Sequence, residues 1–194
     1  MSSSQFSQTN EQDDHDNLTL FDDFGRSLDC YIENSLEYED SIYLLLLPCN
    51  SPVIILSESE ENEDPELEET VIIEDESEIE AIFSDAKAVL AELDLLLHNT
   101  AFTLTITGEL PPLDEENIWN LEIDEEDPLL EQEELQWLAS FYSQGQKYNI
   151  CAPINPILFV ARDNQKEGLQ LLSSSDPELK EVLNELLLED LDEE

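Results

Sequence analysis

Two stretches of this sequence share one pattern: Tyr43-Leu-Leu-Leu-Leu-Pro48-Cys-Asn50-Ser-Pro52-Val-Ile-Ile-Leu56 and Tyr148-Asn-Ile-Cys-Ala-Pro153-Ile-Asn155-Pro156-Ile-Leu-Phe-Val160. In each, a proline follows the tyrosine by five residues, and an asparagine follows two residues later. A second proline then opens an apolar run, with one residue fewer in the second stretch. We call this the Tyr-Pro-Asn-Pro pattern. Because a repeat indicates architecture before any single element is assigned, the pattern predicts two related units.

Short strands are predicted in both halves of the chain. In the first half, alternating apolar and polar residues indicate a hairpin over 18–32, and further strands at 42–47, 53–56 and 70–73. The second half is expected to hold a strand at 102–107, a weak edge strand around 119–123, a hairpin over 135–152 that turns at 143–146, and strands at 157–161 and 169–172. A helical turn at the start of 135–142 is the alternative for the first arm of that hairpin.

Each half is also expected to hold one amphipathic helix, because apolar residues recur at steps of three and four. The first helix is predicted from Ile79 to Leu97, with Ser77 as its N-cap and Glu80 completing a capping box. The second follows Ser175 or Asp176 as cap, with Pro177 in its first turn.

The predicted fold class is therefore α+β, with two tandem related units, each a small, mainly antiparallel sheet followed by one helix. We expect a disordered tail at 1–16, a first repeat at 17–98, a second repeat at 99–190 and an acidic tail at 191–194. Eight carboxylates at 57–69 and eleven at 114–134 predict a solvated loop in the first repeat and a solvated insertion in the second, because like charges repel.

The acidity of the chain restricts its partners. Fifty acidic residues against 6 basic ones give a net charge of −44. Nucleic acids and anionic membrane surfaces are disfavoured as direct ligands, because both recruit cationic groups. No apolar stretch approaches the roughly 20 residues of a bilayer span, and the amino terminus does not resemble a targeting peptide. We expect a cytoplasmic protein without membrane insertion.

No residue pattern indicates catalysis, a cofactor or a metal, so we assign no catalytic, cofactor-binding or metal-binding residues. Cys30, Cys49 and Cys151 lack metal-site spacing and are interpreted as reduced packing thiols. His15 and His98 have no nearby cysteine or histidine partner, and the four glycines form no phosphate-binding loop. The Asp124–Asp127 run lacks the glycine of a calcium loop.

The two arginines and the two repeated tyrosines are given structural interpretations. Arg26 and Arg162 are expected to pair with nearby carboxylates, although the sequence does not define their role. Tyr43 and Tyr148 each begin an apolar strand, which favours packing in a sheet over partner binding.

Several stretches resemble uncharacterised families. Phe102-Thr-Leu-Thr-Ile-Thr-Gly108-Glu-Leu-Pro111, the Tyr148–Ala161 stretch followed by Arg162, and the leucine-rich terminal helix resemble an acidic domain family of unknown function from cyanobacteria and plant plastids. The amino-terminal half, from Leu20-Phe-Asp-Asp-Phe-Gly25-Arg26 to Tyr43–Pro48, is similar to small acidic bacterial proteins of unknown function. The resemblance covers most of 17–190, carries no functional residues, and implies a photosynthetic source with a cyanobacterial cytosol favoured.

These observations predict a non-enzymatic interaction protein, an adaptor or assembly factor that binds a basic protein through complementary charge. One alternative is a nucleic-acid mimic that inhibits a basic nucleic-acid-binding protein, which would need ordered rows of carboxylates. A hydrolase with clustered carboxylates and an adaptation to high salt are further alternatives. The sequence leaves the oligomeric state and the identity of any partner open.

Overall fold

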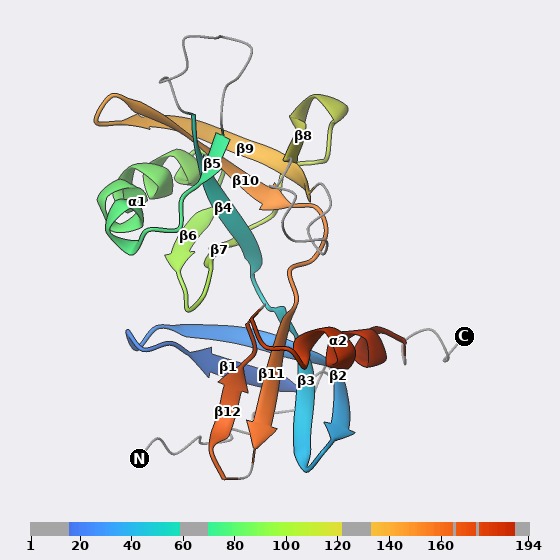
Figure 1. The fold of residues 1–194 in the computed structure, drawn as a ribbon. Helices are drawn as coiled ribbons and strands as arrows, with labels where there is room; N and C mark the ends of the chain where they lie inside the picture. Colours follow the sequence, from blue (N-terminus) through green and yellow to red (C-terminus); the bar gives the residue numbers. More distant parts are fainter. Residues whose placement is uncertain (1–15, 59–69, 122–132, 165, 174, 189–194) are drawn as a thin grey trace. The chain divides into compact units, whose positions relative to one another are not determined.

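A computed structural model describes residues 16–58, 70–121, 133–164, 166–173 and 175–188 (Figure 1). Most of the tails predicted at 1–16 and 191–194, and much of the acidic segments at 57–69 and 114–134, lie outside these residues. The described elements are, in chain order, β1 (Asn17–Phe21), β2 (Ser27–Tyr38), β3 (Ser41–Pro48), β4 (Ser51–Glu58), β5 (Thr70–Ile72), α1 (Glu76–Ala91), β6 (Leu96–Asn99), β7 (Leu104–Thr107), the 3-10 helix η1 (Glu115–Asn117), β8 (Ile118–Leu121), β9 (Glu133–Ser143), β10 (Gln146–Pro153), β11 (Phe159–Asn164), β12 (Gly168–Leu171) and α2 (Leu179–Leu188).

The strands form two sheets. One has five strands in the order β1-β2-β3-β11-β12. The other has seven strands, with the order β6-β7-β4-β10-β9-β8 and with β5 also paired to β4. All strand pairs of the seven-stranded sheet are antiparallel.

The prediction of two tandem units, each a sheet followed by its own helix, is wrong. The first Tyr-Pro-Asn-Pro stretch places β3 in the five-stranded sheet and β4 in the seven-stranded one, whereas the second places β10 and β11 in the opposite order. In addition, β4 pairs with β10, and β3 is the neighbour of β11. Each sheet is therefore built from strands of both halves of the chain, because the two stretches pair with each other instead of within their own half.

The chain divides into two compact units that do not follow the sequence halves. The first comprises Met1–Leu18, Tyr31–Leu46 and Val160–Glu194, and the second comprises Thr19–Cys30 and Leu47–Phe159. The seven-stranded sheet and α1 belong to the second unit, whereas α2 belongs to the first.

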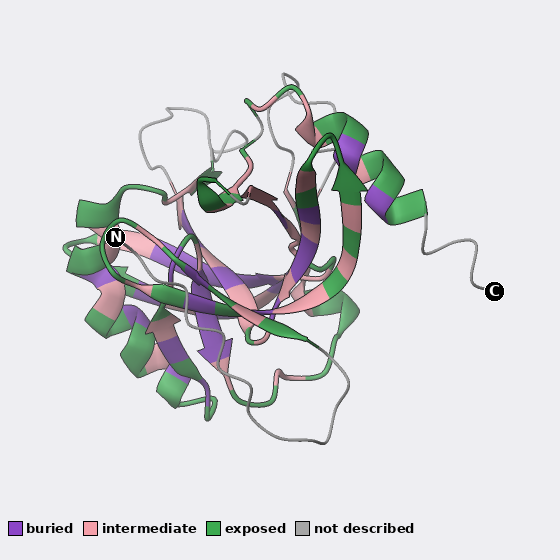
Figure 2. Ribbon diagram, turned by 90° about the horizontal axis from the view of Figure 1, so that it is seen from below, coloured by how far each residue is buried: buried purple, intermediate pink, exposed green. Residues whose placement is uncertain are grey.

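The core of the second unit lies between α1 and one face of the seven-stranded sheet. Ile82, Ala86 and Leu90 of α1 are buried against residues of the central strands, among them Ile55 and Ile150. In Figure 2, buried bands recur along the strands while each helix keeps exposed residues on its outer side. Burial of this apolar surface stabilises the unit by about 25 cal/mol per Å².

The first helix begins and ends at residues that differ from the prediction. Asp75, not Ser77, caps α1, and its side chain accepts a hydrogen bond from the Glu78 amide at 2.9 Å. The helix ends before Leu97 because Asp94 adopts a left-handed conformation, with φ of 58°. The amide of Asp94 then donates to the carbonyl of Ala91, and that of Leu95 to the carbonyl of Leu90, which is the Schellman arrangement.

Leu97 still reaches the same core, but it does so from strand β6. Gly108 packs beside the left-handed turn at the end of α1. A Cβ atom at this position would lie 2.7 Å from the carbonyl oxygen of Asp94, and its φ of +121° disfavours other residues.

In the first unit, α2 is attached to the five-stranded sheet. Val182 and Leu186 are its buried residues. The side-chain amide of Asn34, on β2, donates to the carbonyl of Leu186 at 2.7 Å, and Arg162, on β11, donates to Glu178 at 2.6 Å. The first contact joins α2 to a strand 152 residues away in sequence, and the second ties the residue just before α2 to β11.

The mixed origin of both sheets predicts that neither half of the chain folds alone. We expect fragments 1–98 and 99–194 to lack cooperative unfolding and dispersed amide NMR signals, because each lacks the partner of its central strand. The full chain is the control, and mixing the two fragments is expected to restore dispersion. A well-dispersed spectrum from either isolated fragment would contradict the interleaved fold.

Candidate functional site

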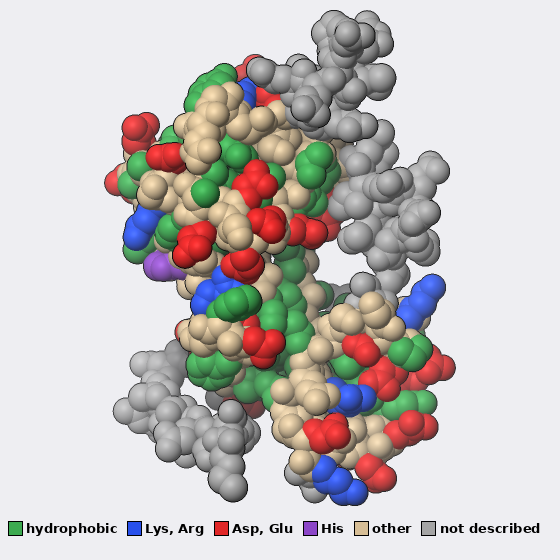
Figure 3. Space-filling view, turned by 60° about the vertical axis from the view of Figure 1, so that its left-hand side comes forward, with side chains coloured by type: hydrophobic (Ala, Val, Ile, Leu, Met, Phe, Trp, Pro, Cys, Tyr) green, Lys and Arg blue, Asp and Glu red, His purple; other side chains and the backbone are tan. Residues whose placement is uncertain are grey.

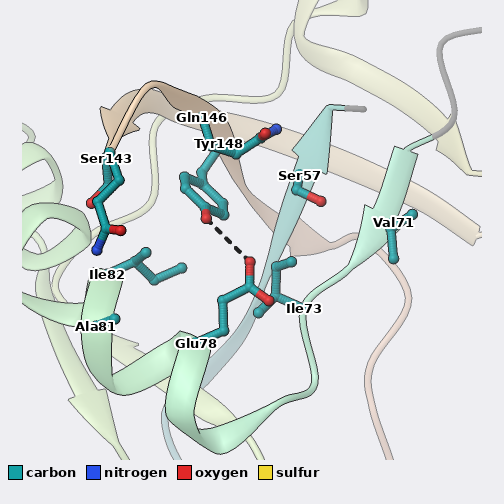
Figure 4. Close-up of a pocket in the computed structure, with 10 residues that line it drawn as sticks. Ser57, Val71, Ile73, Glu78, Ala81, Ile82, Ser143, Gln146 and Tyr148 are labelled. Carbon is teal, nitrogen blue, oxygen red and sulfur yellow. Dashed lines mark hydrogen bonds between the residues drawn. The ribbon is translucent and has the colours of Figure 1, made fainter. Parts of the chain in front are cut away.

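A groove lies in the second unit, between the first turns of α1, strand β5 and the tip of the β9–β10 hairpin (Figure 4). It occupies the part of the sheet face that α1 leaves uncovered. It is a shallow, half-open groove with a volume of about 730 Å³. The lining residues are Ser57, Val71, Ile73, Glu78, Ala81, Ile82, Ser143, Gln144, Gln146 and Tyr148.

Tyr148 and Glu78 form the polar centre of the groove. The Tyr148 hydroxyl donates a hydrogen bond to Glu78 Oε1 at 3.1 Å, and Figure 4 shows the carboxylate between Tyr148 and Ile73. Burial raises the pKa of Tyr148, and the hydrogen bond to Glu78 and the charge of Glu78 raise it further. The Tyr148 hydroxyl therefore stays protonated at neutral pH and orients the carboxylate as a hydrogen-bond donor.

The surroundings of the groove are acidic. Glu74 and the N-cap Asp75 lie between β5 and α1, and Glu76 and Glu78 lie within the first turn of α1. Negative side chains are favourable there, because the amides at a helix N-terminus carry partial positive charge. None of the lining residues is Lys, Arg or His. The groove can thus accept hydrogen bonds and attract a cationic group.

On the opposite face of the same sheet, a polar network surrounds Asn149. The Asn149 side chain is fully buried, accepts from Ser140 Oγ at 2.5 Å and donates to Glu58 Oε1 at 2.7 Å. Lys147 Nζ contacts the two Glu58 oxygens at 2.9 and 3.1 Å. Burial alone would raise the pKa of Glu58, but hydrogen bonds from Lys147 and Asn149, together with the charge of Lys147, lower it below its ordinary value.

The two arginines pair with nearby carboxylates, as predicted. Arg26 donates to Asp22 at 2.6 Å and to both oxygens of Glu76 at 2.9 and 2.8 Å, while its guanidinium lies 5.1 Å from the ring centre of Phe24. Arg26 thereby joins the turn after β1 to the start of α1. Arg162 pairs with Glu178 and donates to Gln170 at 3.0 Å.

The remaining tyrosine, histidine and cysteine residues discussed for the sequence pack or form hydrogen bonds within the fold. Tyr43 is buried with an edge contact to Tyr38, and His98 lies in β6, 3.0 Å from Thr107 Oγ1. Cys30 and Cys151 are fully buried, and burial raises the pKa of each thiol to about 12, which keeps both protonated at neutral pH. His15 and the Asp124–Asp127 run lie outside the described residues.

Two further observations concern only the described part of the chain. No group of three or more His, Cys, Asp or Glu side chains is placed there to hold a metal ion. The helices α1 and α2, at 16 and 10 residues, fall short of the roughly 20 residues that cross a bilayer, and no described helix meets that requirement.

The sequence interpretation of Tyr148 as a residue packed in a sheet fits its burial, but the groove beside it was not predicted. Glu78 and Tyr148 are separated by 70 residues, and no local pattern links them. In the sequence, nothing distinguishes Glu78 from the other acidic residues near the start of the predicted helix. Glu78 and Tyr148 meet because α1 packs on the face of the sheet to which Tyr148 of β10 points, and the pairing of β10 with β4 places Tyr148 opposite Ser57 there.

Comparison with known families covers both halves of the chain. A family model described as a protein of unknown function, DUF3727, matches residues 94–190. The chain belongs to the DUF3727 family. The expectation of an uncharacterised domain family is confirmed in this respect. A second model, for proteins of unknown function of the DUF1292 type, matches residues 23–91. No curated protein and no solved structure matches the chain.

The junction of the two family matches falls at the end of α1. The DUF3727 region contributes Ser143, Gln144, Gln146 and Tyr148 to the groove, and the DUF1292-like region contributes the other lining residues. The groove therefore exists only where both regions fold together.

Replacing Glu78 by Gln is expected to lower the pKa of Tyr148, because the nearby negative charge is lost. Burial would still keep the pKa of Tyr148 in this variant above the ordinary tyrosine value. An NMR titration of tyrosine Cζ signals, with Tyr148→Phe to assign the resonance, measures this change. Glu80→Gln, on an exposed part of α1, is the matched control. An unchanged Tyr148 titration in Glu78→Gln would disprove the contact.

The Glu58 network predicts a pH-dependent contribution to stability. Because the pKa of Glu58 is lowered on folding, its stabilisation is present above the ordinary value of 4.5 and is lost as pH falls through the lowered value. Relative to wild type, we expect Glu58→Gln to lose up to about 1 kcal/mol of unfolding free energy near neutral pH, and less in acid. Urea unfolding across this range measures the difference, and a Lys147→Met background should shrink it. A difference that does not vary with pH would exclude this role for Glu58.

Proposed function

We propose that this protein is a non-enzymatic acidic interaction protein, an adaptor or assembly factor that binds a basic protein partner at the groove of Glu78 and Tyr148. The observation that carries the proposal is the groove itself. It places an oriented carboxylate beside apolar side chains, with no cation in its lining. A lysine or arginine side chain of a partner would find both a charge partner and an apolar surface for its stem.

The charge distribution supports attraction of a basic partner. Of the 6 basic residues in the sequence, Arg26, Lys147 and Arg162 are paired with carboxylates, so their positive charge is locally compensated. Figure 3 shows Asp and Glu side chains in separate groups among hydrophobic and uncharged ones. A field of this sign accelerates encounter with a cationic partner and weakens as salt is added.

The chemistry of the groove supports binding more than catalysis. General acid–base catalysis at neutral pH favours a group whose pKa lies near about 7, and the pKa of Tyr148 is instead raised above its ordinary value of 10.0. In this groove the two ionisable side chains, Glu78 and Tyr148, are hydrogen-bonded to each other, and that bond holds the carboxylate in place. Such an arrangement suits recognition of a donor group on a partner.

The proposed setting follows from the resemblance described for the sequence. We propose that the protein acts in the cytoplasm of a photosynthetic organism, a cyanobacterium in the first instance, and that acidity is a shared property of its relatives. A nucleic-acid mimic is the alternative. The separate groups of carboxylates on the face in Figure 3 favour it less, because a mimic would present continuous rows.

The test is affinity purification with the full chain from cyanobacterial lysate at a low and a moderate salt concentration, followed by mass spectrometry. We expect a specific basic protein whose recovery falls as salt rises. Glu78→Gln should reduce its recovery severalfold, because the groove loses its charge, while the exposed Glu80→Gln should not.

Two results would count against the proposal. One is the absence of any specific basic protein at both salt concentrations. The other is equal capture by wild type and Glu78→Gln. Competition between duplex DNA and the protein for the captured partner would instead support the mimic.

A further inference from the structure

One side of the groove is formed by strand β5, which lies at an edge of the sheet as far as the described residues show. Strand β5 pairs with β4 in the register Leu56↔Ile72, Ser57↔Val71 and Glu58↔Thr70. Among the described strands, none pairs with the other edge of β5. A free strand edge is a template for another chain, because its amides and carbonyls lack partners in the sheet.

The register shows which backbone groups face the open edge. The amide of Ile73 donates to the carbonyl of Ile55 at 2.9 Å, so residue 73 directs its polar groups toward β4. Bonding direction alternates along an antiparallel strand, so Val71 also faces β4, whereas Thr70 and Ile72 direct their amides and carbonyls outward. Two residues therefore offer a donor and an acceptor each, at the spacing of a strand.

The side chains beside this edge define the chemistry of the occupant. Val71 is 51% exposed, and Val71 and Ile73 give the groove an apolar border. Glu74 comes two residues after the end of β5, and Glu78 lies in the groove. An extended segment added to β5 would direct alternate side chains toward the groove face. Basic side chains at those positions would meet Glu78 and Glu74.

We propose that the partner binds by β-strand addition: an extended segment that alternates basic and apolar residues pairs with the open edge of β5 and directs its basic side chains toward Glu78. This inference rests on the proposed function and specifies how the partner is held. Strand addition combines main-chain hydrogen bonds, which supply affinity, with side-chain contacts, which supply specificity. Because β5 has only three residues, the charge contacts are needed to select the occupant.

The test uses the full chain and two synthetic peptides of alternating lysine and valine. The second peptide is methylated on the backbone nitrogens of alternate residues, so it keeps the charges but cannot donate along one edge. Titration at low salt is expected to show binding of the first peptide, and at least tenfold weaker binding of the methylated one. Amide hydrogen exchange of Ile72 should slow at least tenfold on binding of the first peptide, because that amide becomes bonded.

A substitution in β5 gives an independent readout. The amide of Thr70 points away from β4 and takes no part in the pairing of β5 with β4. Thr70→Pro removes this amide and is therefore expected to weaken binding of the unmodified peptide severalfold. Thr70→Ala keeps the amide and is the matched control. Thermal unfolding of both variants, with little change expected, checks that the sheet is intact.

The outcomes separate the two proposals. Equal binding of both peptides, reduced by Glu78→Gln, with no protection of Ile72, would overturn strand addition and leave the proposed groove function in place. If neither peptide binds at low salt, both proposals fail. Binding of the unmodified peptide with protection of Ile72 and loss in Thr70→Pro supports strand addition.

Discussion

The pairing of β4 with β10 is the interaction on which the rest of the structure depends. These strands are central in the seven-stranded sheet, and each also connects to a strand of the five-stranded sheet. Their shared inward face carries Ile55 and Ile150, which are almost completely buried beneath α1. Loss of the β4–β10 pairing would remove the sheet surface on which α1 packs, and it would also remove a pairing between the two halves of the sequence.

The two polar sites lie on opposite faces of that ladder. Tyr148 reaches Glu78 on the α1 face, while its neighbours Lys147 and Asn149 contact Glu58 on the other. Successive residues of one strand point to opposite faces, so three adjacent residues serve two environments. On one face, the hydrogen-bond network of Asn149 and Glu58 is stable only when each of its polar groups has a partner. On the other face, the Glu78 carboxylate lies at the groove.

Local features of this fold were predictable from the sequence, and long-range ones were not. The β9–β10 hairpin was found because Gln144-Gly145 takes a turn with positive φ at both residues, for which glycine is a recognisable mark. The end of α1 was missed because Asp94, not glycine, adopts the left-handed conformation. The sheets were assigned wrongly because a repeated pattern carries no information on whether its copies pair internally or with each other. For the same reason the groove, which needs residues from both copies, was invisible in the sequence.

The order of strands along the chain also matters during synthesis. Asn149 follows Glu58 by 91 residues, so at about 5–20 residues per second one edge of β4 waits roughly 5–18 s until β10 has been made. Strands β5 and β7, which also pair with β4, are made earlier, but the β10 edge of the apolar run Val53 to Leu56 has no partner during that time and is prone to self-association. The eight carboxylates at 57–69 follow it directly and act as gatekeepers, because repulsion between nascent chains opposes aggregation. The acidity that is expected to select partners in the folded state thus protects the unfinished chain beforehand.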